Sequence, residues 1–364
     1  AIGYASLSKN TTGTSNTAIG WAALEVNTTA SNNVAVGHAA ARSNTTGTRI
    51  IAIGYGALDG QDTENDNIAI GYNAMTTNNA GGEENIMIGS YAGDAITSGD
   101  SNVMIGHNAG TALTTGSENT GIGEGVLDSL TTGSDNCAFG RKALQGVTSS
   151  NNNVAMGENA GGGITTGHSN TCIGFQSGAY QQDIVEGTKN VTLGMYCYTS
   201  ASDATQQIVM GYNVSGNANS SLVFGHESND SAIAFGETSI SAPSDIRLKE
   251  NINDSTAGLS FINDLRPVTF NWKKEKDIPE EMIAHKADSE ERFNNDKLNH
   301  GFIAQEVKEA IDNHSELKDG FNMWKEDDSD GRQRIGDGAL VPMLVKSIQE
   351  LSTKNDSLET SNTA

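Results

Sequence analysis

The chain has 364 residues, enough for more than one domain, and it is poor in charged (18%), hydrophobic (36%) and aromatic (5%) side chains but rich in glycine, with 42. Its 22 basic and 45 acidic residues give a formal charge of −23, whose negative field repels phosphate backbones and disfavours nucleic acid as a partner. It holds no apolar run of 18 residues, so we expect no insertion into a membrane.

A period dominates residues 1–240. A triplet that ends in glycine recurs fifteen times, as in AIG, AVG and MIG, and the step between these glycines is 17 residues almost throughout. The exceptions are one step of 18, one of 20 and two final steps of 14 and 11. The repeat glycines are Gly3, Gly20, Gly37, Gly54, Gly71, Gly89, Gly106, Gly123, Gly140, Gly157, Gly174, Gly194, Gly211, Gly225 and Gly236.

Three further positions of the repeat are regular. The residue before each glycine is apolar in every copy, the residue three after it is alanine in most copies, and asparagine stands four before it in ten copies. Short β-type triplets between Gly, Asn and Thr corners, at a period too short for a helical hairpin, predict one coil of a parallel β-solenoid per copy. We expect the apolar residue to point inward, the glycine to permit a sharp bend or positive φ, and the asparagines to stack as a hydrogen-bonded ladder.

The interior predicted in this way is thin. One large apolar residue per coil, flanked by alanines, contributes about 1.5–3 kcal/mol per 17 ordered residues, well below the conformational entropy that it must offset. We expect the missing burial to come from other copies of the chain, packed side by side, with the alanines allowing close approach. A monomeric solenoid is the alternative.

With these motifs, the repeats resemble the β-roll heads of trimeric bacterial adhesins and, more closely, the β-repeat shafts of bacteriophage tail fibres. The resemblance implies a mainly β fold with a trimeric parallel β-solenoid (β-roll) shaft. Because the first residues, AIGYASLSKNTTG, begin inside a repeat, we expect this chain to be the distal part of a longer fibre.

Several side chains invite a functional interpretation that the repeat explains better. Asn10, Asn27 and Asn44 each begin a glycosylation sequon but recur at the 17-residue step, as solenoid corners would. His38 and His107 directly follow repeat glycines, which indicates coil surface rather than a metal site. The cysteines include no CxxC pair and stand at apolar positions, so we expect small buried hydrophobes. They are Cys137, Cys172 and Cys197.

The rest of the chain has another composition. After Gly236 the period ends, all four prolines lie beyond residue 242, and charged residues mix with helix patterns. The change predicts a shaft over 1–240, a small α+β domain over 241–339 and a coiled-coil helix over 340–364.

Two patterns predict elements of the α+β domain. Residues 321–335 predict a hairpin whose acidic turn lacks the closing glutamate of a calcium loop and is interpreted as solvated. Residues 300–312 predict a helix with one apolar face, formed by Phe302, Ile303, Val307 and Ile311.

The tail has the pattern of a coiled coil. Its apolar residues advance by alternating steps of three and four, and Asn355 falls at an a position, where a buried polar residue sets register and oligomer state. Three heptads are marginal alone, so we expect the seam to assist trimerisation rather than to hold it unaided. The seam residues are Val341, Leu344, Ile348, Leu351, Asn355 and Leu358.

Four motifs in order, SDIRLKENI, LRPVTFNW, HGFIAQEV and LVPMLVKSIQEL, resemble the intramolecular chaperone and auto-processing domain at the carboxyl end of phage tailspikes and tail fibres, typified by endosialidase. The resemblance covers residues 241–360; RIGDGALVP lacks a tyrosine that often precedes the leucine in that family. It implies a domain that trimerises, templates the folding of the shaft, and then cuts itself off.

The resemblance also assigns the residues of the cut. The family's serine falls on Ser244 and its lysine on Lys249, and the scissile bond would join Ser244 to Asp245. Lysine can act as the base only if burial lowers its pKa from about 10.4 towards 7 or 8, and folding of the trimer would supply that burial. Asp245 and Arg247 are expected to fix the loop. Attack by Ser244 on its own carbonyl would close a strained four-membered ring, so attack across chains or help from the Asp245 carboxylate stays open.

The predicted function is therefore the structural, receptor-binding distal part of a phage tail fibre, a homotrimer located in the virion and assembled in the bacterial host cytoplasm. Its partner would be a host cell-surface receptor, either a polysaccharide or an outer-membrane component. The expected activity is a single-turnover autoproteolysis by a Ser-Lys dyad, with no metal and no cofactor. A trimeric bacterial surface adhesin with a solenoid head is the alternative.

Overall fold

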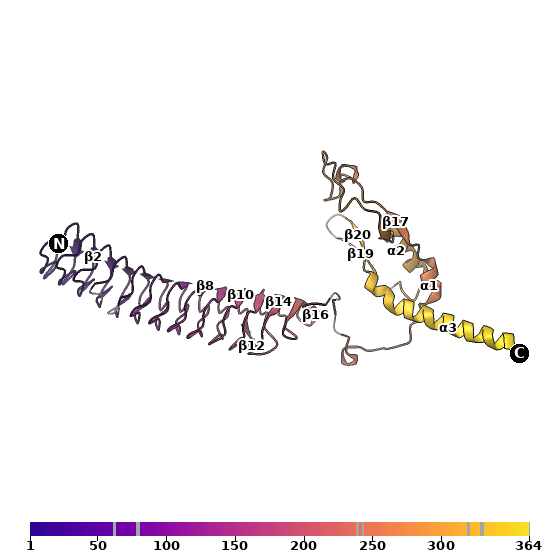
Figure 1. Ribbon diagram of the computed structural model, residues 1–364, viewed down its shortest axis with the longest axis horizontal. Helices are drawn as coiled ribbons and strands as arrows, with labels where there is room; N and C mark the ends of the chain where they lie inside the picture. The colour runs from indigo at the N-terminus through magenta and orange to yellow at the C-terminus, as the bar shows by residue number, and fades with distance from the viewer. Residues whose placement is uncertain are drawn as a thin grey trace. The chain divides into compact units, whose positions relative to one another are not determined.

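The computed structural model describes residues 1–60, 63–77, 81–237, 240–241, 244–318, 321–327 and 331–363. The chain divides into two compact units, Ala1–Asp245 and Ile246–Ala364, which are taken one at a time below (Figure 1). Pro243, near the predicted end of the shaft, lies outside the described residues, and the predicted division into three domains stays a prediction.

The first unit is a β-solenoid of stacked parallel coils, as predicted (Figure 1). Each strand pairs with the next in a register that places equivalent repeat positions side by side, so that Ala18 pairs with Ala35 and Ala35 with Ala52. The strands are β1 Thr17–Ile19, β2 Val34–Val36, β3 Ile51–Ile53, β4 Ile68–Ile70, β5 Ile86–Ile88, β6 Val103–Ile105, β7 Thr120–Ile122, β8 Cys137–Phe139, β9 Val154–Met156, β10 Thr171–Ile173, β13 Val191–Leu193, β14 Gln207–Tyr212 and β15 Ser221–His226.

The repeat glycine is required by both its backbone angle and its neighbour. In the described coils from Gly3 to Gly211 the repeat glycines have φ between 123° and 144°, a region that side-chain-bearing residues rarely adopt. A Cβ on Gly37 would lie 2.2 Å from the carbonyl oxygen of Gly54 in the next coil. The stacking distance between coils is therefore one that only glycine permits at this position.

The asparagine four residues before the glycine forms the predicted ladder. Asn119 Nδ2 donates to Asn102 Oδ1 at 3.0 Å and to the Gly133 carbonyl at 2.9 Å, and the Asn119 backbone N–H donates to the same Oδ1 at 3.0 Å. Equivalent side-chain bonds join successive coils up to Asn190, where Nδ2 donates to Asn170 at 3.0 Å. These amides are fully buried, so the ladder satisfies polar groups inside the coil and ties each coil to its neighbours.

The predicted direction of the apolar residue before the glycine is wrong. That residue points outward, with Ile19 41% and Met156 50% exposed, and the middle residue of each strand, such as Ala18 or Met104, is buried inside the coil. Side chains alternate along a strand, so a three-residue strand that buries its middle residue must expose the other two.

The predicted role of the alanines three after the glycine is wrong as well. They are fully buried in the coil interior, where they pack with larger residues such as Leu24, Leu58 and Leu144, and they offer no surface to another solenoid. The coil interior is narrow, and the larger side chains that follow these alanines, such as Leu24, already occupy most of it, so only a small side chain fits at the alanine position. These alanines are Ala23, Ala40, Ala57, Ala74, Ala92, Ala109, Ala143 and Ala160.

The other corner predictions hold for most residues. Asn27 and Asn44 are fully buried, and Asn27 Nδ2 donates to Asn10 Oδ1 at 2.8 Å, so these sequons are solenoid corners. His38 and His107 are exposed on the coil surface. Cys172 and Cys197 are buried free thiols, and burial raises the pKa of Cys172 to about 11. Cys137 is the exception, because it stands first in β8 and faces outward, half-buried.

Two hairpins interrupt the regular stacking. One coil, between Gly174 and Gly194, carries an extra antiparallel pair, β11 Ala179–Tyr180 and β12 Gln182–Asp183. At the last coil, β15 pairs in parallel with β14 and antiparallel with β16, Asn229–Ala234. On the other side of β16, Ala232 and Ser241 exchange backbone hydrogen bonds of 2.8 and 2.7 Å.

The second unit is a small α/β region that ends in a long helix (Figure 1). Phe261 is fully buried at its centre, packed among Val307, Ile311, Leu340 and Met343. None of the helices in the described part of the chain is long and apolar enough to cross a membrane. The elements are η1 Ile246–Leu248, α1 Leu259–Asp264, β17 Val268–Phe270, η2 Glu275–Asp277, β18 Asn299–Gly301, α2 Ala304–Asn313, β19 Trp324–Glu326, β20 Gln333–Ile335, η3 Asp337–Leu340 and α3 Val341–Thr363.

The patterns in this unit predict its elements closely. The helix predicted over 300–312 begins at Ala304 and buries Val307 and Ile311, but its predicted start is wrong, because His300 and Gly301 belong to β18 and the half-buried Phe302 and Ile303 precede the helix. The hairpin predicted over 321–335 is β19 paired with β20. Asp327 pairs with Arg334 at the start of its acidic turn, whose residues 328–330 lie outside the described part of the chain.

Candidate processing site and assembly surfaces

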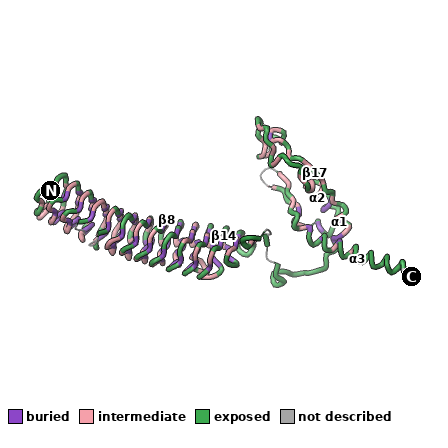
Figure 2. Tube along the Cα trace, viewed as in Figure 1, coloured by how far each residue is buried: buried purple, intermediate pink, exposed green. Residues whose placement is uncertain are grey.

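The predicted scissile bond lies at the border of the two compact units. The first unit ends at Asp245, and every residue from Ser244 to Thr256 is exposed (Figure 2). The short turn η1 separates Ser244 from Lys249, and the Lys249 backbone N–H donates to the Ile246 carbonyl at 3.2 Å. The predicted nucleophile and base therefore flank one turn of an exposed segment.

The single chain does not supply the burial that the predicted chemistry needs. Ser244, Asp245, Arg247 and Lys249 are all exposed. A lysine serves as a base near neutral pH only in surroundings that exclude water, so a surface beyond these residues must cover Lys249 before it can act. The catalytic and supporting roles of the four residues stay predictions.

Three aliphatic side chains beside the scissile bond were not singled out in the sequence. Ile246, Leu248 and Ile252 are 72%, 70% and 62% exposed. Clustered exposed aliphatic groups mark a surface that another surface covers. Their alternation with charged residues in SDIRLKENI is the signal that identifies them.

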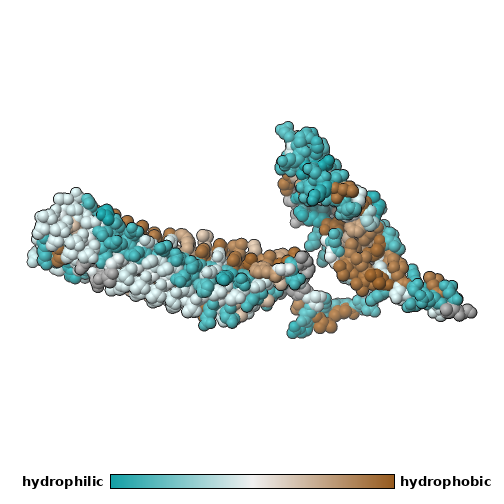
Figure 3. Space-filling view, viewed as in Figure 1, coloured by the Kyte–Doolittle hydropathy of each residue, from teal (hydrophilic) through white to brown (hydrophobic). Residues whose placement is uncertain are grey.

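The outward faces of the solenoid strands form a continuous apolar surface. We call it the outer stripe and define it as the residues one and three before each repeat glycine, from Thr17 to Phe224. Most are Ile or Val, every one is exposed or half-buried, and the stripe follows the edge of the solenoid drawn in brown in Figure 3. The apolar triplets of the sequence contain this surface, although the sequence alone suggested an inward direction for half of it.

A second uncovered apolar surface is the seam of α3. One side of the helix packs against α1, where Met343 lies in the same buried cluster as Phe261, and Ser347 is buried one turn further on. The predicted seam lies on another side, where Leu344, Ile348, Leu351 and Leu358 are exposed in the single chain. Asn355, also exposed, donates to Glu359 Oε1 at 3.2 Å.

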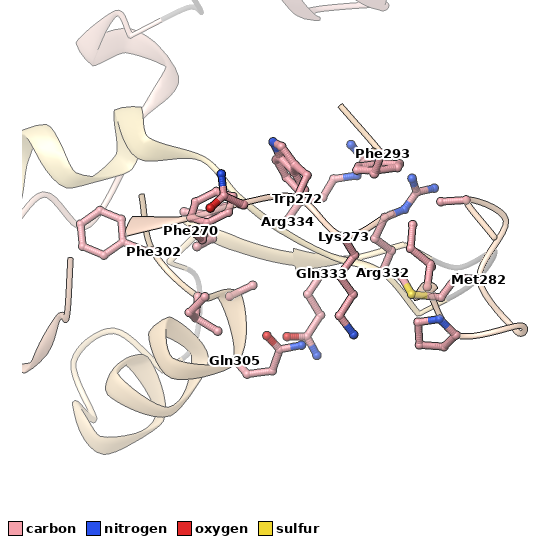
Figure 4. A pocket seen from close by; sticks show the side chains of 17 residues that line it. Phe270, Trp272, Lys273, Met282, Phe293, Phe302, Gln305, Arg332, Gln333 and Arg334 are labelled. Atoms are coloured by element: carbon pink, nitrogen blue, oxygen red, sulfur yellow. The ribbon is translucent and has the colours of Figure 1, made fainter. Parts of the chain in front are cut away.

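The second unit also has an open apolar groove of about 840 Å³ (Figure 4). Its aromatic wall contains Trp272, with ring centroids 5.2 Å from Phe270 and 5.3 Å from Phe293. The lining includes Lys273, Arg332 and Arg334 but no carboxylate, thiol, imidazole or hydroxyl side chain among the described residues. Lys273 is therefore the one titratable side chain other than arginine among the described residues that line the groove.

Ion pairs hold the loop that forms one side of this groove. Glu290 bridges Lys274 and Lys276, and these hydrogen bonds lower the pKa of Glu290 to about 2. Lys286 Nζ donates to Glu275 Oε1 at 2.8 Å, and Ser289 Oγ donates to Oε2 of the same carboxylate at 2.7 Å. Within the described residues, no three His, Cys, Asp or Glu side chains are grouped to hold a metal ion.

A comparison with protein families matches residues 244–316 to the family model described as "Chaperone of endosialidase". The match begins at Ser244, the first residue of the predicted cut. No curated protein and no solved structure matches the chain. The protein thus joins a β-solenoid to an intramolecular chaperone domain of the endosialidase type. This combination fits a tail fibre or an adhesin that carries a chaperone domain.

Proposed function

We propose that this chain is the distal, receptor-binding part of a phage tail fibre, a homotrimer located in the virion and assembled in the cytoplasm of the bacterial host. The observation that carries the proposal is the chaperone match at 244–316 directly after the last coil of a solenoid. The chaperone domain aligns three chains, the shaft folds beside it, and the chaperone is then removed.

The outer stripe and the α3 seam support the trimer. In a threefold assembly of parallel solenoids, the same row of each copy faces the axis, so the stripes meet along their whole length. Each coil presents two outward side chains, and covering one aliphatic side chain contributes about 1.5–3 kcal/mol. Burial between copies therefore adds to the burial inside each coil and offsets a further part of the entropy lost on ordering it.

The proposed cut is an attack across chains, which avoids the four-membered ring. Ser244 Oγ of one copy loses its proton to Lys249 and attacks the carbonyl carbon of Ser244 in a neighbouring copy. The bond to Asp245 breaks, its nitrogen takes the proton from Lys249, and an ester joins the two serines. Water then hydrolyses the ester, leaving a carboxylate on the released shaft and a free amino group on Asp245. Covering Lys249 during assembly makes the cut wait for the trimer.

Mass spectrometry of freshly expressed protein tests the cut. The wild type is expected to give fragments of 244 and 120 residues, since 364 − 244 = 120, and Ser244→Ala is expected to stay intact. Ser255→Ala, an exposed serine of the same segment, is the matched control and is expected to be cut normally. In mixed trimers, wild-type chains are expected to cut tagged Ser244→Ala chains.

Each part of the proposal has its own contrary result. A wild type that is folded, trimeric by light scattering and uncut overturns the autoproteolysis and leaves the shaft proposal. If mixed trimers cut their wild-type chains but leave the Ser244→Ala chains intact, attack across chains is overturned. A monomeric, uncut Ser244→Ala chain overturns the assembly itself.

A further inference from the structure

The coil between Gly174 and Gly194 is built around an added hairpin. It is three residues longer than the usual coil, and the addition forms β11 and β12, with Gln181 at the turn between them. The preceding coil makes room for it, because a Cβ on Gly163 would lie 2.3 Å from Asp183 Cγ. The hairpin therefore packs closely against the preceding coil and has a defined position on the solenoid.

The hairpin gathers aromatic side chains on the solenoid surface. The Tyr180 ring lies 4.2 Å from that of Tyr196 and 6.3 Å from that of Tyr198, and Tyr196 also contacts Phe175 at 5.4 Å and Tyr212 at 6.2 Å, all between centroids. All five rings are partly exposed. The exposed Gln181 adds an amide whose Oε1 is 3.5 Å from the Tyr198 hydroxyl. We call Phe175, Tyr180, Tyr196, Tyr198, Tyr212 and Gln181 the tyrosine cluster.

The cluster is placed to stay accessible in a trimer. Its residues are not part of the outer stripe. Figure 1 shows β12, the partner of β11 with Tyr180, on the side of the solenoid away from the parallel strands, whereas Tyr212 is the last residue of the parallel strand β14. Three repeat glycines, Gly194, Gly211 and Gly225, lie between the hairpin and the end of the solenoid. At about 4.8 Å per coil, the hairpin is about 14 Å from the last coil. The cluster extends from the hairpin to Tyr212, which pairs with His226 of that last coil, near the tip that the predicted cut would free.

We propose that the tyrosine cluster binds a neutral polysaccharide of the host surface; this inference rests on the proposed receptor-binding function. Aromatic faces cover the C–H side of a sugar ring, and hydroxyl and amide groups both donate to and accept from sugar hydroxyls. A cluster of this size is small for a protein partner, whose interface covers about 800 Å² on each side. The 20 acidic and 6 basic residues of positions 1–243 repel anionic polysaccharides, which selects an uncharged one.

An array of immobilised bacterial polysaccharides, neutral and anionic, tests the inference with the full chain. The wild type is expected to bind at least one neutral polysaccharide, and Tyr180→Ala and Gln181→Gly are expected to bind it about tenfold more weakly or worse. Tyr72→Ala is the matched control, because Tyr72 is a half-exposed tyrosine stacked in another aromatic row, with its ring 5.2 Å from that of Tyr55. Its binding is expected to be unchanged.

Thermal unfolding of each variant separates loss of binding from loss of fold. Gln181 is exposed with φ 53°, an angle that glycine adopts freely, so Gln181→Gly carries the test even if Tyr180→Ala unfolds. Undiminished binding by folded Gln181→Gly and Tyr180→Ala overturns the site, and binding to anionic polysaccharides alone overturns the ligand class.

Binding to whole bacteria distinguishes this inference from the proposed function. A chain that binds cells but no polysaccharide has a protein receptor, which overturns the inference and leaves the proposed function. A chain that binds neither overturns both.

Discussion

At the scale of single residues, the solenoid depends on positions where chemistry leaves no choice. Gly123 has φ 142°, and a Cβ there would lie 2.4 Å from the carbonyl oxygen of Gly140 in the next coil. Two residues later, Gly125 has φ 60° and room for a Cβ, and the same repeat position holds Ala22 and Ala39 in other coils. The two glycines are therefore neighbours in one coil, but only Gly125 has a conformation and surroundings that accept a Cβ.

We therefore expect Gly123→Ala to lower the free energy of unfolding of the shaft by at least about 3 kcal/mol, because strain and a backbone clash add. Gly125→Ala is expected to cost about 1 kcal/mol, the ordinary penalty of a left-handed residue. Thermal unfolding followed by circular dichroism measures both, and limited proteolysis locates the opened coil. Equal stability of the two variants would contradict the requirement for glycine.

The residue scale also shows what the sequence could and could not predict. The glycine and the asparagine ladder were predictable because each depends on a local property: a backbone angle, or a side chain long enough to reach the next coil. The direction of the Ile19 side chain and its equivalents was not predictable. In the triplet Thr17-Ala18-Ile19 either Ala18 or Ile19 could face the interior, and the choice depends on how much room the interior has. The interior accepts Ala18 since Leu24 already fills it.

At the scale of elements, α1 and α2 are joined by a histidine at the end of α2. His314 Nε2 lies 2.8 Å from Asp264 Oδ2, and Nδ1 lies 3.2 Å from Glu316 Oε1. The hydrogen bond to Asp264, with a further contribution from Glu316, raises the pKa of His314. The Phe261 ring packs against the imidazole at 5.4 Å, so this contact reaches the core of the unit.

The raised pKa of His314 predicts how stability changes with pH. The charged imidazole stabilises the folded unit fully below the unfolded-state pKa of about 6.5, and this contribution is lost as the pH rises through the higher folded-state pKa. Melting of the helical signal is therefore expected to shift to lower temperature above that pH in uncut Ser244→Ala protein. His314→Gln is expected to remove the shift, and His300→Gln, an exposed histidine of β18, to keep it. If the melting temperature of His314→Gln still falls over the same pH range, the pH dependence belongs to another group.

Elements of the second unit were predictable where periodicity was strong. The steps of three and four in α3 and the apolar face of α2 predict helices that the structure contains. The groove around Trp272 was not predictable, because Phe270, Phe293 and Arg334 come from segments that only the fold brings together. The processing segment is intermediate: its residues follow from the motif, whereas its full exposure is visible only in the structure.

At the scale of the whole molecule, Cys137 reports on the proposed packing of three shafts. It lies on the outer stripe, half-buried in the single chain, whereas Cys172 and Cys197 are buried inside the coil. If the stripes meet at a threefold axis, the three copies of Cys137 lie close to one another.

A short bis-maleimide is therefore expected to join chains of the native trimer through Cys137. The double variant Cys137→Ser, Thr132→Cys moves the thiol to an exposed corner of the same repeat, outside the stripe, and is expected to give monomers only. Denaturing electrophoresis after the reaction separates the results. A trimer in which Cys137 never reacts across chains, or in which the corner thiol reacts as well, would refute packing through the stripe.

The hairpin of β15 and β16 gives the finished shaft a closed end. The last coil of an open parallel sheet presents unpaired backbone donors and acceptors that recruit a strand from another molecule. Here β16 turns back along β15, Ser241 pairs with its outer side, and all three precede the predicted cut. The cover consequently stays with the shaft when the chaperone leaves. Fibres crowded together in one cell then remain separate particles instead of joining tip to tip into aggregates.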